Sequence, residues 1–350
     1  MTNEPAYYHA VALALGGDPG KLRKLQAQFH GAKHPWKSAF AYLAGRDPRP
    51  PDPDTAWREL TEAGIRIVFL ENPDFPLLLR EIHHPPIALY CLGSPPGGIL
   101  GNRTISIVGT RRATTEGKDA ARQFGREFAE AGVTVASGLA LGIDAAAHQG
   151  CLSASGRTVA VLACGLDRFY PGENDPLARR ILAEGGSIIS EYPPGQPPYP
   201  ARFLERNRIV CGISAGVLII EAPRRSGSLA TAAYAREQNR DLFVIPGPIA
   251  HPNFFGSHAL IRQGAELVTK PGDILAAYGI EPGTPGGFGD LAANGPEMLI
   301  FRILRGFSDP ADIDKIIETA KLEPRIVNRA LSVLLLKNMV RESDAGYIIE

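Results

Sequence analysis

The chain has 350 residues, of which 38 are glycine, 30 are proline and 44% are apolar. This length suffices for two or three domains, and the apolar content is typical of a globular protein with many turns and excludes a disordered one. Lys and Arg together number 37, as do Asp and Glu, so the formal net charge is zero. That balance excludes a uniformly basic nucleic-acid coat and an acidic tail protein, but it allows a local basic groove.

The beginning of the chain lacks the features of a secretory signal, because residues 1–20 contain no Lys or Arg. No stretch approaches the roughly 18 consecutive apolar residues of a membrane helix. The four cysteines include no C-x-x-C pair, and the eight histidines show no metal-binding spacing. We therefore expect a cytoplasmic protein with buried thiols, no membrane segment, no metal and no cofactor.

Residues 1–82 are predicted to form a helical, SAM-like module. Apolar residues recur at helical spacing in four stretches, and a short strand follows at Ile65–Leu70. The four stretches are Tyr8–Leu15, Leu22–Phe29, Trp36–Leu43 and Trp57–Ala63. The Pro-rich segment Asp47–Pro53 interrupts them.

Residues 83–280 are predicted to form a core in which β-branched runs alternate with helices. The expected strands are Thr104–Val108, Val133–Ala136, Thr158–Leu162, Ser187–Ser190, Val217–Glu221, Leu242–Ile245 and Glu266–Val268. The expected helices are Lys118–Ala131, Ala145–Ala154, Pro176–Ala183, Leu229–Gln238 and Ser257–Gln263. Apolar strands alternating with helices indicate a parallel sheet covered on both faces. The fold class is therefore α/β, with a Rossmann-like, doubly wound parallel sheet.

A Gly- and Pro-rich linker at 281–296 precedes a third module at 297–350. Three helical stretches, Glu297–Leu304, Asp312–Ala320 and Pro324–Lys337, are followed by a hairpin pattern at Val340–Ile349. Three helices closed by a β-wing indicate a winged-helix (DML1-like) module. Its nearly balanced charge favours a protein-contact or dimer role, although a basic face balanced by an acidic one is an alternative.

Three glycine-bearing turns follow predicted strands, and in a doubly wound sheet such turns meet outside the carboxyl ends of the strands. They are Gly109–Thr115, Ser137–Asp144 and Arg224–Thr231. The first carries two guanidinium groups suited to phosphate, and the third places two arginines before a helix start. None of them matches G-x-G-x-x-G or a Walker motif, which argues against dinucleotide binding and NTPase activity.

A single glycine in a turn usually serves only the backbone conformation and indicates no ligand, and Ser228 and Thr231 could simply cap a helix. Three turns with four arginines among them favour phosphate binding. Segment 201–225 adds three further arginines and holds five basic and two acidic residues. A solvated helix face is one interpretation of that segment. An Arg-lined groove beside Phe203 and Tyr199 would instead suit the backbone and stacked bases of a single strand.

The residues also allow two enzymatic alternatives. His148 follows Asp144 by four residues, so the two could form an acid–base pair, although we favour capping and packing as their roles. Glu221 and Glu237 are candidates for carboxylates flanking a glycosidic bond. No Ser-His-Asp order or nucleophile elbow is present.

Seven blocks in order across residues 105–268 resemble the DNA-processing protein A (DprA/Smf) family. They are Ile107–Arg111, Ser137–Asp144 with His148, Gly165–Pro171, Ser190–Pro193, Arg206–Ile209, Ser226–Ala232 and Ile245–Gly247. The resemblance implies a bacterial protein of natural transformation that binds and protects incoming single-stranded DNA (ssDNA), helps to load the recombinase RecA, and is a binder and not an enzyme. We also expect a homodimer.

The resemblance implies that the phosphate pocket involves Arg111, Ser137, Gly138, Arg206, Asn207, Arg208, Ser226, Gly227 and Ser228. The residue patterns add Gly109, Arg112, Arg202 and Arg225 to the predicted site. His258 stands where family members usually carry Asn, so we do not count it as a contact. Two other functions remain open: a lysine-decarboxylase-like nucleotide N-glycosidase, and an interaction scaffold built on the winged helix.

Overall fold

The computed structural model describes residues 3–100, 103–280, 296–307, 310–336, 340–343 and 346–349. These residues form two compact units, 1–273 and 274–350. Apart from Pro296, the predicted linker lies outside the described residues. None of the described helices combines the length and the apolar character needed to span a bilayer.

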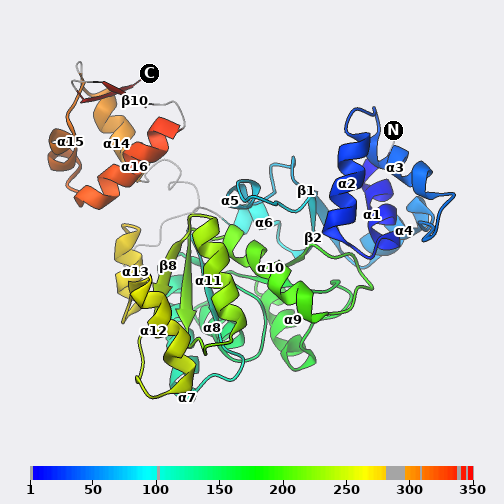
Figure 1. The fold of residues 1–350 in the computed structure, drawn as a ribbon, viewed down its shortest axis with the longest axis horizontal. Helices are drawn as coiled ribbons and strands as arrows, with labels where there is room; N and C mark the ends of the chain where they lie inside the picture. Colours follow the sequence, from blue (N-terminus) through cyan, green and yellow to red (C-terminus); the bar gives the residue numbers. More distant parts are fainter. Residues whose placement is uncertain are drawn as a thin grey trace. The chain divides into compact units, whose positions relative to one another are not determined.

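The first unit, coloured from blue to yellow in Figure 1, is built on a nine-stranded sheet. The strand order is β1-β2-β6-β5-β4-β3-β7-β8-β9. The strands are β1 Arg66–Phe69, β2 Ala88–Gly93, β3 Thr104–Gly109, β4 Thr134–Ser137, β5 Thr158–Leu162, β6 Ser187–Ser190, β7 Gly216–Ile220, β8 Asp241–Val244 and β9 Glu266–Leu267. The strands from β6 to β9 in this order are parallel. An α/β fold with a mostly parallel sheet is therefore confirmed.

Two strands depart from the predicted parallel sheet. β2 runs antiparallel to both β1 and β6, so the sheet is mixed at this edge. The sequence prediction omitted β2 and assigned the strand at β1 to the N-terminal module. β1 instead extends the core sheet, because its backbone pairs with β2.

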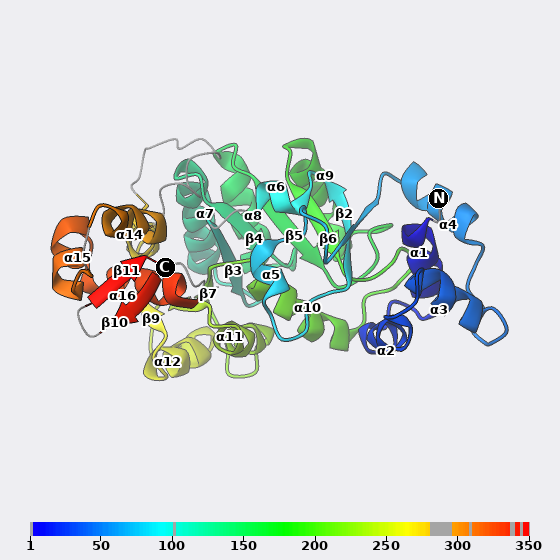
Figure 2. The ribbon, with the colours of Figure 1, turned by 90° about the horizontal axis from the view of Figure 1, so that it is seen from above.

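Helices cover both faces of the sheet, as Figure 2 shows. On one face lie α7 Thr115–Glu130, α8 Ile143–Ser153 and α9 Asp175–Ala183, and on the other lie α10 Pro200–Gly212, α11 Gly227–Glu237 and α12 Phe255–Arg262. The alternation of strand side chains supplies both cores. In β5, Val159 and Val161 pack into one hydrophobic cluster, whereas Ala160 and Leu162 pack into the other.

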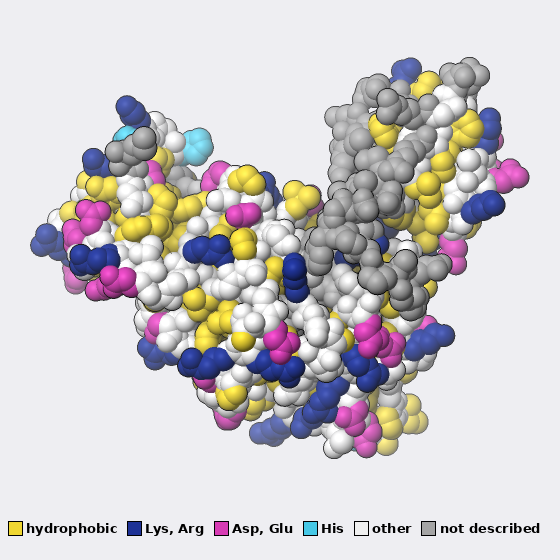
Figure 3. Space-filling view, turned by 180° about the vertical axis from the view of Figure 1, so that it is seen from behind, with side chains coloured by type: hydrophobic (Ala, Val, Ile, Leu, Met, Phe, Trp, Pro, Cys, Tyr) yellow, Lys and Arg dark blue, Asp and Glu magenta, His cyan; other side chains and the backbone are white. Residues whose placement is uncertain are grey.

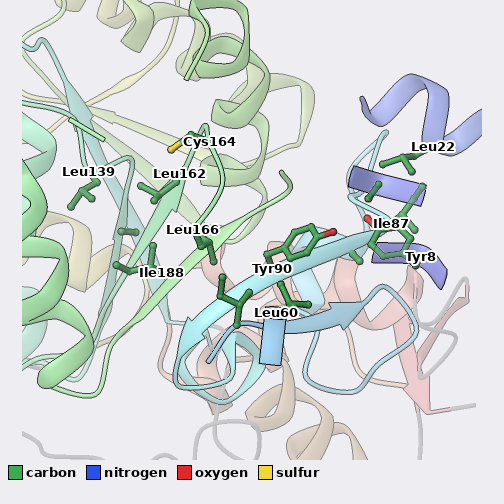
Figure 4. Close-up of a cluster of buried hydrophobic side chains, with 14 of the residues drawn as sticks. Tyr8, Leu22, Leu60, Ile87, Tyr90, Leu139, Leu162, Cys164, Leu166 and Ile188 are labelled. Atoms are coloured by element: carbon green, nitrogen blue, oxygen red, sulfur yellow. The ribbon is translucent and has the colours of Figure 1, made fainter. Parts of the chain in front are cut away.

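The N-terminal helices pack on the β2 end of the sheet. They are α1 Glu4–Ala14, α2 Pro19–Phe29, α3 Pro35–Leu43 and α4 Pro53–Glu62, and each carries Pro in its first two positions, where no intrahelical donor is needed. Their cluster of buried side chains continues past Tyr90 of β2 into the core (Figure 4). Tyr8 packs edge-on against Phe69, and His9 Nδ1 lies 3.1 Å from the buried Tyr90 hydroxyl. The division at residue 82 stays a prediction.

Five short elements complete the description of residues 3–280. They are α5 Leu77–Arg80, α6 Pro96–Ile99, the 3-10 turns η1 Gly172–Asn174 and η2 Pro252–Phe254, and α13 Pro271–Ala277. The four cysteines are all buried and free.

The second unit contains three helices and a two-stranded antiparallel ribbon. They are α14 Pro296–Arg305, α15 Ile313–Ala320, α16 Pro324–Leu336, β10 Val340–Ser343 and β11 Gly346–Ile349. Ile300, Ile316 and Leu331 contribute to one buried cluster that joins the three helices. The order of these elements follows the sequence prediction, while Asp344 and Ala345 of the predicted hairpin turn lie outside the described residues.

The topology places a switch point at the carboxyl end of β3. The chain fills the sheet from β3 through β4 and β5 to β6, then returns to add β7 beside β3. Loops after β3 and β7 therefore diverge to opposite faces, which leaves a crevice for ligands. Gly109 ends β3 there, and a Cβ on it would clash with the Ile220 carbonyl oxygen.

Candidate nucleic-acid interface

The first turn carries exposed guanidinium groups to the carboxyl edge of the sheet. Arg111 and Arg112 follow β3 and are both exposed. The Arg111 guanidinium lies over the Phe203 ring of α10, 4.7 Å from its centre, and Arg206 lies 6.0 Å from the same ring. The contact thus joins the first turn to α10 through a cation–π interaction, in which the face of an aromatic ring attracts a positive charge.

Arg206 is a buried positive charge beneath the second turn. It is 4% exposed, and its Nη1 donates to the carbonyl oxygens of Gly138 (2.7 Å) and Val161. Burial lowers the pKa of Arg206, while the nearby Asp144 carboxylate raises it. A Cβ on Gly138 would press into the guanidinium, so the close approach at this position requires glycine.

The second turn is closed by its own hydrogen bonds. The buried Asp144 carboxylate accepts from the backbone N–H groups of Gly138 (3.1 Å) and Ala140 (3.3 Å). Burial raises the pKa of Asp144, and Arg206 lowers it. Ser137 Oγ donates to the Ile107 carbonyl oxygen at 2.6 Å. The hydroxyl of Ser137 and the amide of Gly138 therefore donate to groups of the protein. The second turn shapes the surface of the site but offers a ligand few hydrogen-bond donors.

The third turn begins helix α11. Ser226 caps that helix by accepting from the Ser228 N–H (3.2 Å), and the two serine hydroxyls lie 2.6 Å apart. Asn207 Nδ2 donates to the Gly227 carbonyl oxygen at 3.4 Å, which connects this turn to α10. Gly227 opens the helix, where backbone N–H groups lack intrahelical acceptors, and Arg225 before it is exposed. This end of α11 is suited to an anion.

Most of the predicted site residues are thus brought together. Arg111, Ser137, Gly138, Arg206, Asn207, Ser226, Gly227 and Ser228 form a connected set through the contacts above, with Gly109 and Arg112 on the same first turn. Arg224 and Arg225 precede the third turn, and Arg224 lies over the Phe255 ring at 5.3 Å.

Two predicted arginines are placed elsewhere. Arg202 lies between the rings of Tyr192 and Tyr199 and donates to the carbonyl oxygens of Gly16 (3.0 Å) and Pro197 (2.9 Å). Arg208 is buried and forms an ion pair with the buried Glu191. Both guanidinium groups bind the protein itself, which leaves them less available for phosphate.

The charge on the α7–α9 face contrasts with that of the site. Figure 3 shows this face, where positive and negative side chains are interspersed over the core. On α7, Arg122 pairs with Asp119 at 2.7 Å, and on α9, Arg180 pairs with Glu184 at 2.6 Å. Among the described residues, Arg111, Arg112, Arg224 and Arg225 form no ion pair with a carboxylate. In this part of the chain, the exposed arginines of the first and third turns are therefore available to an anion.

The residues proposed for acid–base chemistry are not arranged for it. His148 is fully buried, and its Nδ1 contacts Thr158 Oγ1 at 2.7 Å instead of Asp144. Burial lowers the pKa of His148 to about 3. Glu221 is buried before α11, whereas Glu237 is exposed at the last of its eleven residues, about 16 Å along the helix. Within the described ranges, no His, Cys, Asp and Glu side chains cluster as a metal site.

Several side chains at this edge were missed by sequence reasoning. Tyr170, 41% exposed, lies with its ring 5.7 Å from that of Phe203. Leu141 and Ile249 are further exposed apolar side chains, in the loops that follow β4 and β8. Their position after strand ends was the available signal. Asn253, which touches the first turn, carried no such signal because it lies in η2, far along the chain.

His258 is engaged inside the protein. Its Nε2 donates to the Gly247 carbonyl oxygen at 3.1 Å, and its ring stacks on Phe254. The side chain therefore stabilises the loop after β8, which agrees with leaving it out of the predicted contacts.

Comparison with known proteins agrees with this arrangement. Residues 66–279 match the family model described as DNA recombination-mediator protein A. The chain belongs to this family. Protein Smf of Synechocystis sp. is 38% identical over 80% of this chain and 74% of its own length. This agrees with the resemblance to DprA/Smf proteins that the seven motifs indicate.

Two solved structures of the family share the fold. DNA processing protein A of Streptococcus pneumoniae has a TM-score of 0.66 and 30% identity, covering 80% of this chain and 99% of its own. DNA processing protein A of Helicobacter pylori has a TM-score of 0.55 and 31% identity, covering 61% of this chain and 95% of its own. The Helicobacter structure is described for the unique single-stranded DNA binding mode of that protein.

Proposed function

We propose that this chain is a non-enzymatic ssDNA-binding protein that contacts the phosphate backbone with Arg111, Arg112 and Arg225. The observation that carries the proposal is the gathering of unpaired, exposed arginines at the topological switch point. Phosphates would meet these guanidinium groups and the positive end of the α11 helix dipole. The single-stranded DNA binding described for the Helicobacter relative supports the same assignment.

Aromatic side chains next to the arginines favour a single strand over a duplex. Phe203 and Tyr170 form a pair of rings beside Arg111, and Tyr199 is 53% exposed. Unpaired bases can stack on such rings, whereas the bases of a duplex are already stacked on one another. Arg206, buried behind Gly138, adds a positive charge that solvent ions screen only weakly.

The wider role follows from the family. We propose that the protein acts in natural transformation, protects incoming ssDNA and helps to load RecA, as a homodimer. The order of helices and ribbon in residues 296–349 supports a winged-helix module, and the four N-terminal helices support a SAM-like module. The N-glycosidase alternative is less favoured, because Glu221 lies before the beginning of α11 whereas Glu237 is the last residue of that helix. The two carboxylates therefore cannot flank one glycosidic bond.

The test is ssDNA binding by Arg111→Ala and Arg225→Ala. Each substitution should weaken binding of all sequences to a similar degree and reduce the slope of log K against log salt by roughly one unit, because a phosphate contact releases counterions. Fluorescence anisotropy of labelled oligonucleotides at several salt concentrations measures both quantities. Arg122→Ala is the matched control, since Arg122 is paired with Asp119 on α7. Unchanged affinity and slope in both site variants would refute the assignment.

A further inference from the structure

Glu221 is an unusual residue at the switch point. Its side chain is fully buried, and its φ of 55° places a non-glycine residue in the left-handed region. Such a conformation persists only where the surrounding structure determines it, and it is frequently found at functional sites. Its backbone carbonyl accepts from the Thr110 N–H at 2.9 Å, at the beginning of the first turn.

The Glu221 carboxylate ties three connections together. It accepts from the Thr114 N–H at 3.0 Å and from the Thr114 hydroxyl, both in the β3–α7 connection. It also accepts from Asn253 Nδ2 in η2, at 2.7 Å. The same Asn253 amide donates to the Arg112 carbonyl oxygen at 3.0 Å. The loop that carries Arg111 and Arg112 is therefore held at both ends.

The position of the carboxylate also explains where an incoming phosphate can bind. The carboxylate of Glu221, a residue that follows β7, lies at the start of α7. Helix α7 follows β3, the first of the parallel strands in the chain. In doubly wound folds the positive end of this helix is a common anion position. Here the Glu221 carboxylate occupies this anion position. Gly117 makes space for it, because a Cβ at residue 117 would clash with a carboxylate oxygen of Glu221. Phosphate is directed to the outer side of the loop, where Arg111 and Arg112 are exposed.

We propose that Glu221 is a positioning residue of the ssDNA site: as an internal anion at the start of α7, it fixes, together with Asn253, the loop that presents Arg111 and Arg112 to phosphate. This inference rests on the proposed ssDNA function. It assigns Glu221 no contact with DNA. The residue acts through the two arginines.

The decisive variant is Glu221→Gly, because glycine adopts a positive φ without strain and removes the side chain that carries the carboxylate. We expect its ssDNA affinity to fall about tenfold and its salt slope to fall by about one unit for each phosphate that the loop no longer binds. In a chain that already carries Arg111→Ala and Arg112→Ala, Glu221→Gly should produce no further loss of affinity. Glu221→Gln, which keeps an acceptor for Thr114 and Asn253, should retain most of the binding.

Ser106→Ala is the matched control for the removal of a buried hydrogen bond. Ser106 lies in β3 but bonds to Val210 and Ser214, away from the turns. It should lower stability and leave the affinity and the salt slope unchanged. Undiminished ssDNA affinity in folded Glu221→Gly, or a further loss in the chain lacking both arginines, would overturn the inference.

Limited trypsin digestion separates this inference from the proposed function. Release of the loop in Glu221→Gly should speed cleavage after Arg111 and Arg112, as mapped by mass spectrometry, while the rest of the core stays protected. If the wild-type chain fails to bind ssDNA but this local cleavage appears, the proposed function is wrong, and the role of Glu221 in fixing the loop is correct. Cleavage at the wild-type rate in Glu221→Gly would show that Glu221 does not hold the loop.

Discussion

Arginine side chains have two different tasks in this chain. Arg111, Arg112 and Arg225 are exposed at the turns, whereas Arg206 and Arg208 are buried and bound to internal partners. An exposed guanidinium can exchange water for phosphate at little cost. A buried one must keep its partners, because an unpaired buried charge is strongly destabilising. Substitution of Arg206 or Arg208 is therefore expected to affect folding as well as binding.

This difference could not be read from the sequence. The pattern of arginines after predicted strands located the first and third turns correctly, since the ends of parallel strands share an edge. It did not reveal which guanidinium groups would meet carbonyl oxygens or a carboxylate. Arg202 illustrates the limit, because its partner Gly16 is 186 positions away in the chain.

His148 makes stability depend on pH. Thr158 Oγ1 donates to the Val135 carbonyl oxygen, so His148 Nδ1 carries a proton and donates to Thr158. Burial disfavours a second proton on the ring by lowering the pKa of His148. Its folded pKa of about 3 lies below the ordinary 6.5, so the unfolded state binds the extra proton. Stability is therefore fully present above about pH 6.5 and is lost as pH falls toward 3, with a slope of up to about 1.4 kcal/mol per pH unit. His9, with a pKa of about 4, acts in the same direction.

The measurement is the free energy of unfolding in urea between pH 6 and pH 4. His148→Asn, which can still donate to Thr158, should flatten the pH dependence by about one proton. Thr158→Val keeps the buried ring and should keep the slope while lowering stability. An equally steep pH dependence in His148→Asn would contradict the assignment of this proton.

At the scale of elements, proline and glycine mark the helix ends. Proline is the first or second residue of all four N-terminal helices, and Gly132, Gly185 and Gly264, which have positive φ, follow helices. These signals made most helices and strands predictable. β2, α5, α6 and α13 were not assigned. The segment of α10 was considered as a helix only in one interpretation, because its arginines obscure its buried face.

Helices α7 and α8 pack closely enough to require glycine. A Cβ on Gly150 would clash with the Arg122 carbonyl oxygen across the interface. Gly150→Ala should therefore destabilise the protein by about 1–3 kcal/mol, because the helices must separate. Gly272→Ala in α13, where a Cβ meets open space, should instead stabilise it by roughly 0.5–1 kcal/mol. Urea midpoints measure both changes, and equal effects of the two substitutions would contradict the packing argument.

Arg202 connects the N-terminal helices to the segment before α10. It donates to the Gly16 carbonyl oxygen and to Gln196 Oε1. Arg202→Ala should therefore weaken the docking of residues 3–62 and increase their cleavage by protease, and it should reduce ssDNA affinity less than Arg111→Ala does. Limited proteolysis and anisotropy measure the two effects. An affinity loss larger than that of Arg111→Ala, with unchanged cleavage, would show that Arg202 binds phosphate directly.

At the scale of the whole molecule, a net charge of zero conceals an uneven distribution. The arginines of α7 and α9 are paired with carboxylates, while among the described residues those of the first and third turns are not. The switch point between β3 and β7 brings those turns together although more than a hundred residues separate them. The doubly wound pattern allowed this convergence to be predicted, and the sequence also placed Phe203 near the arginines. The ring of Tyr170 was not predicted, because its contact with Phe203 depends on the packing of α10.

The most direct test is a titration of the wild-type chain with a single-stranded oligonucleotide and its duplex at two salt concentrations. Exposed arginines with adjacent rings predict tighter binding of the single strand at both concentrations and an affinity that falls as salt rises. Equal or tighter binding of the duplex, or an affinity for the single strand independent of salt, would contradict the proposed ssDNA site.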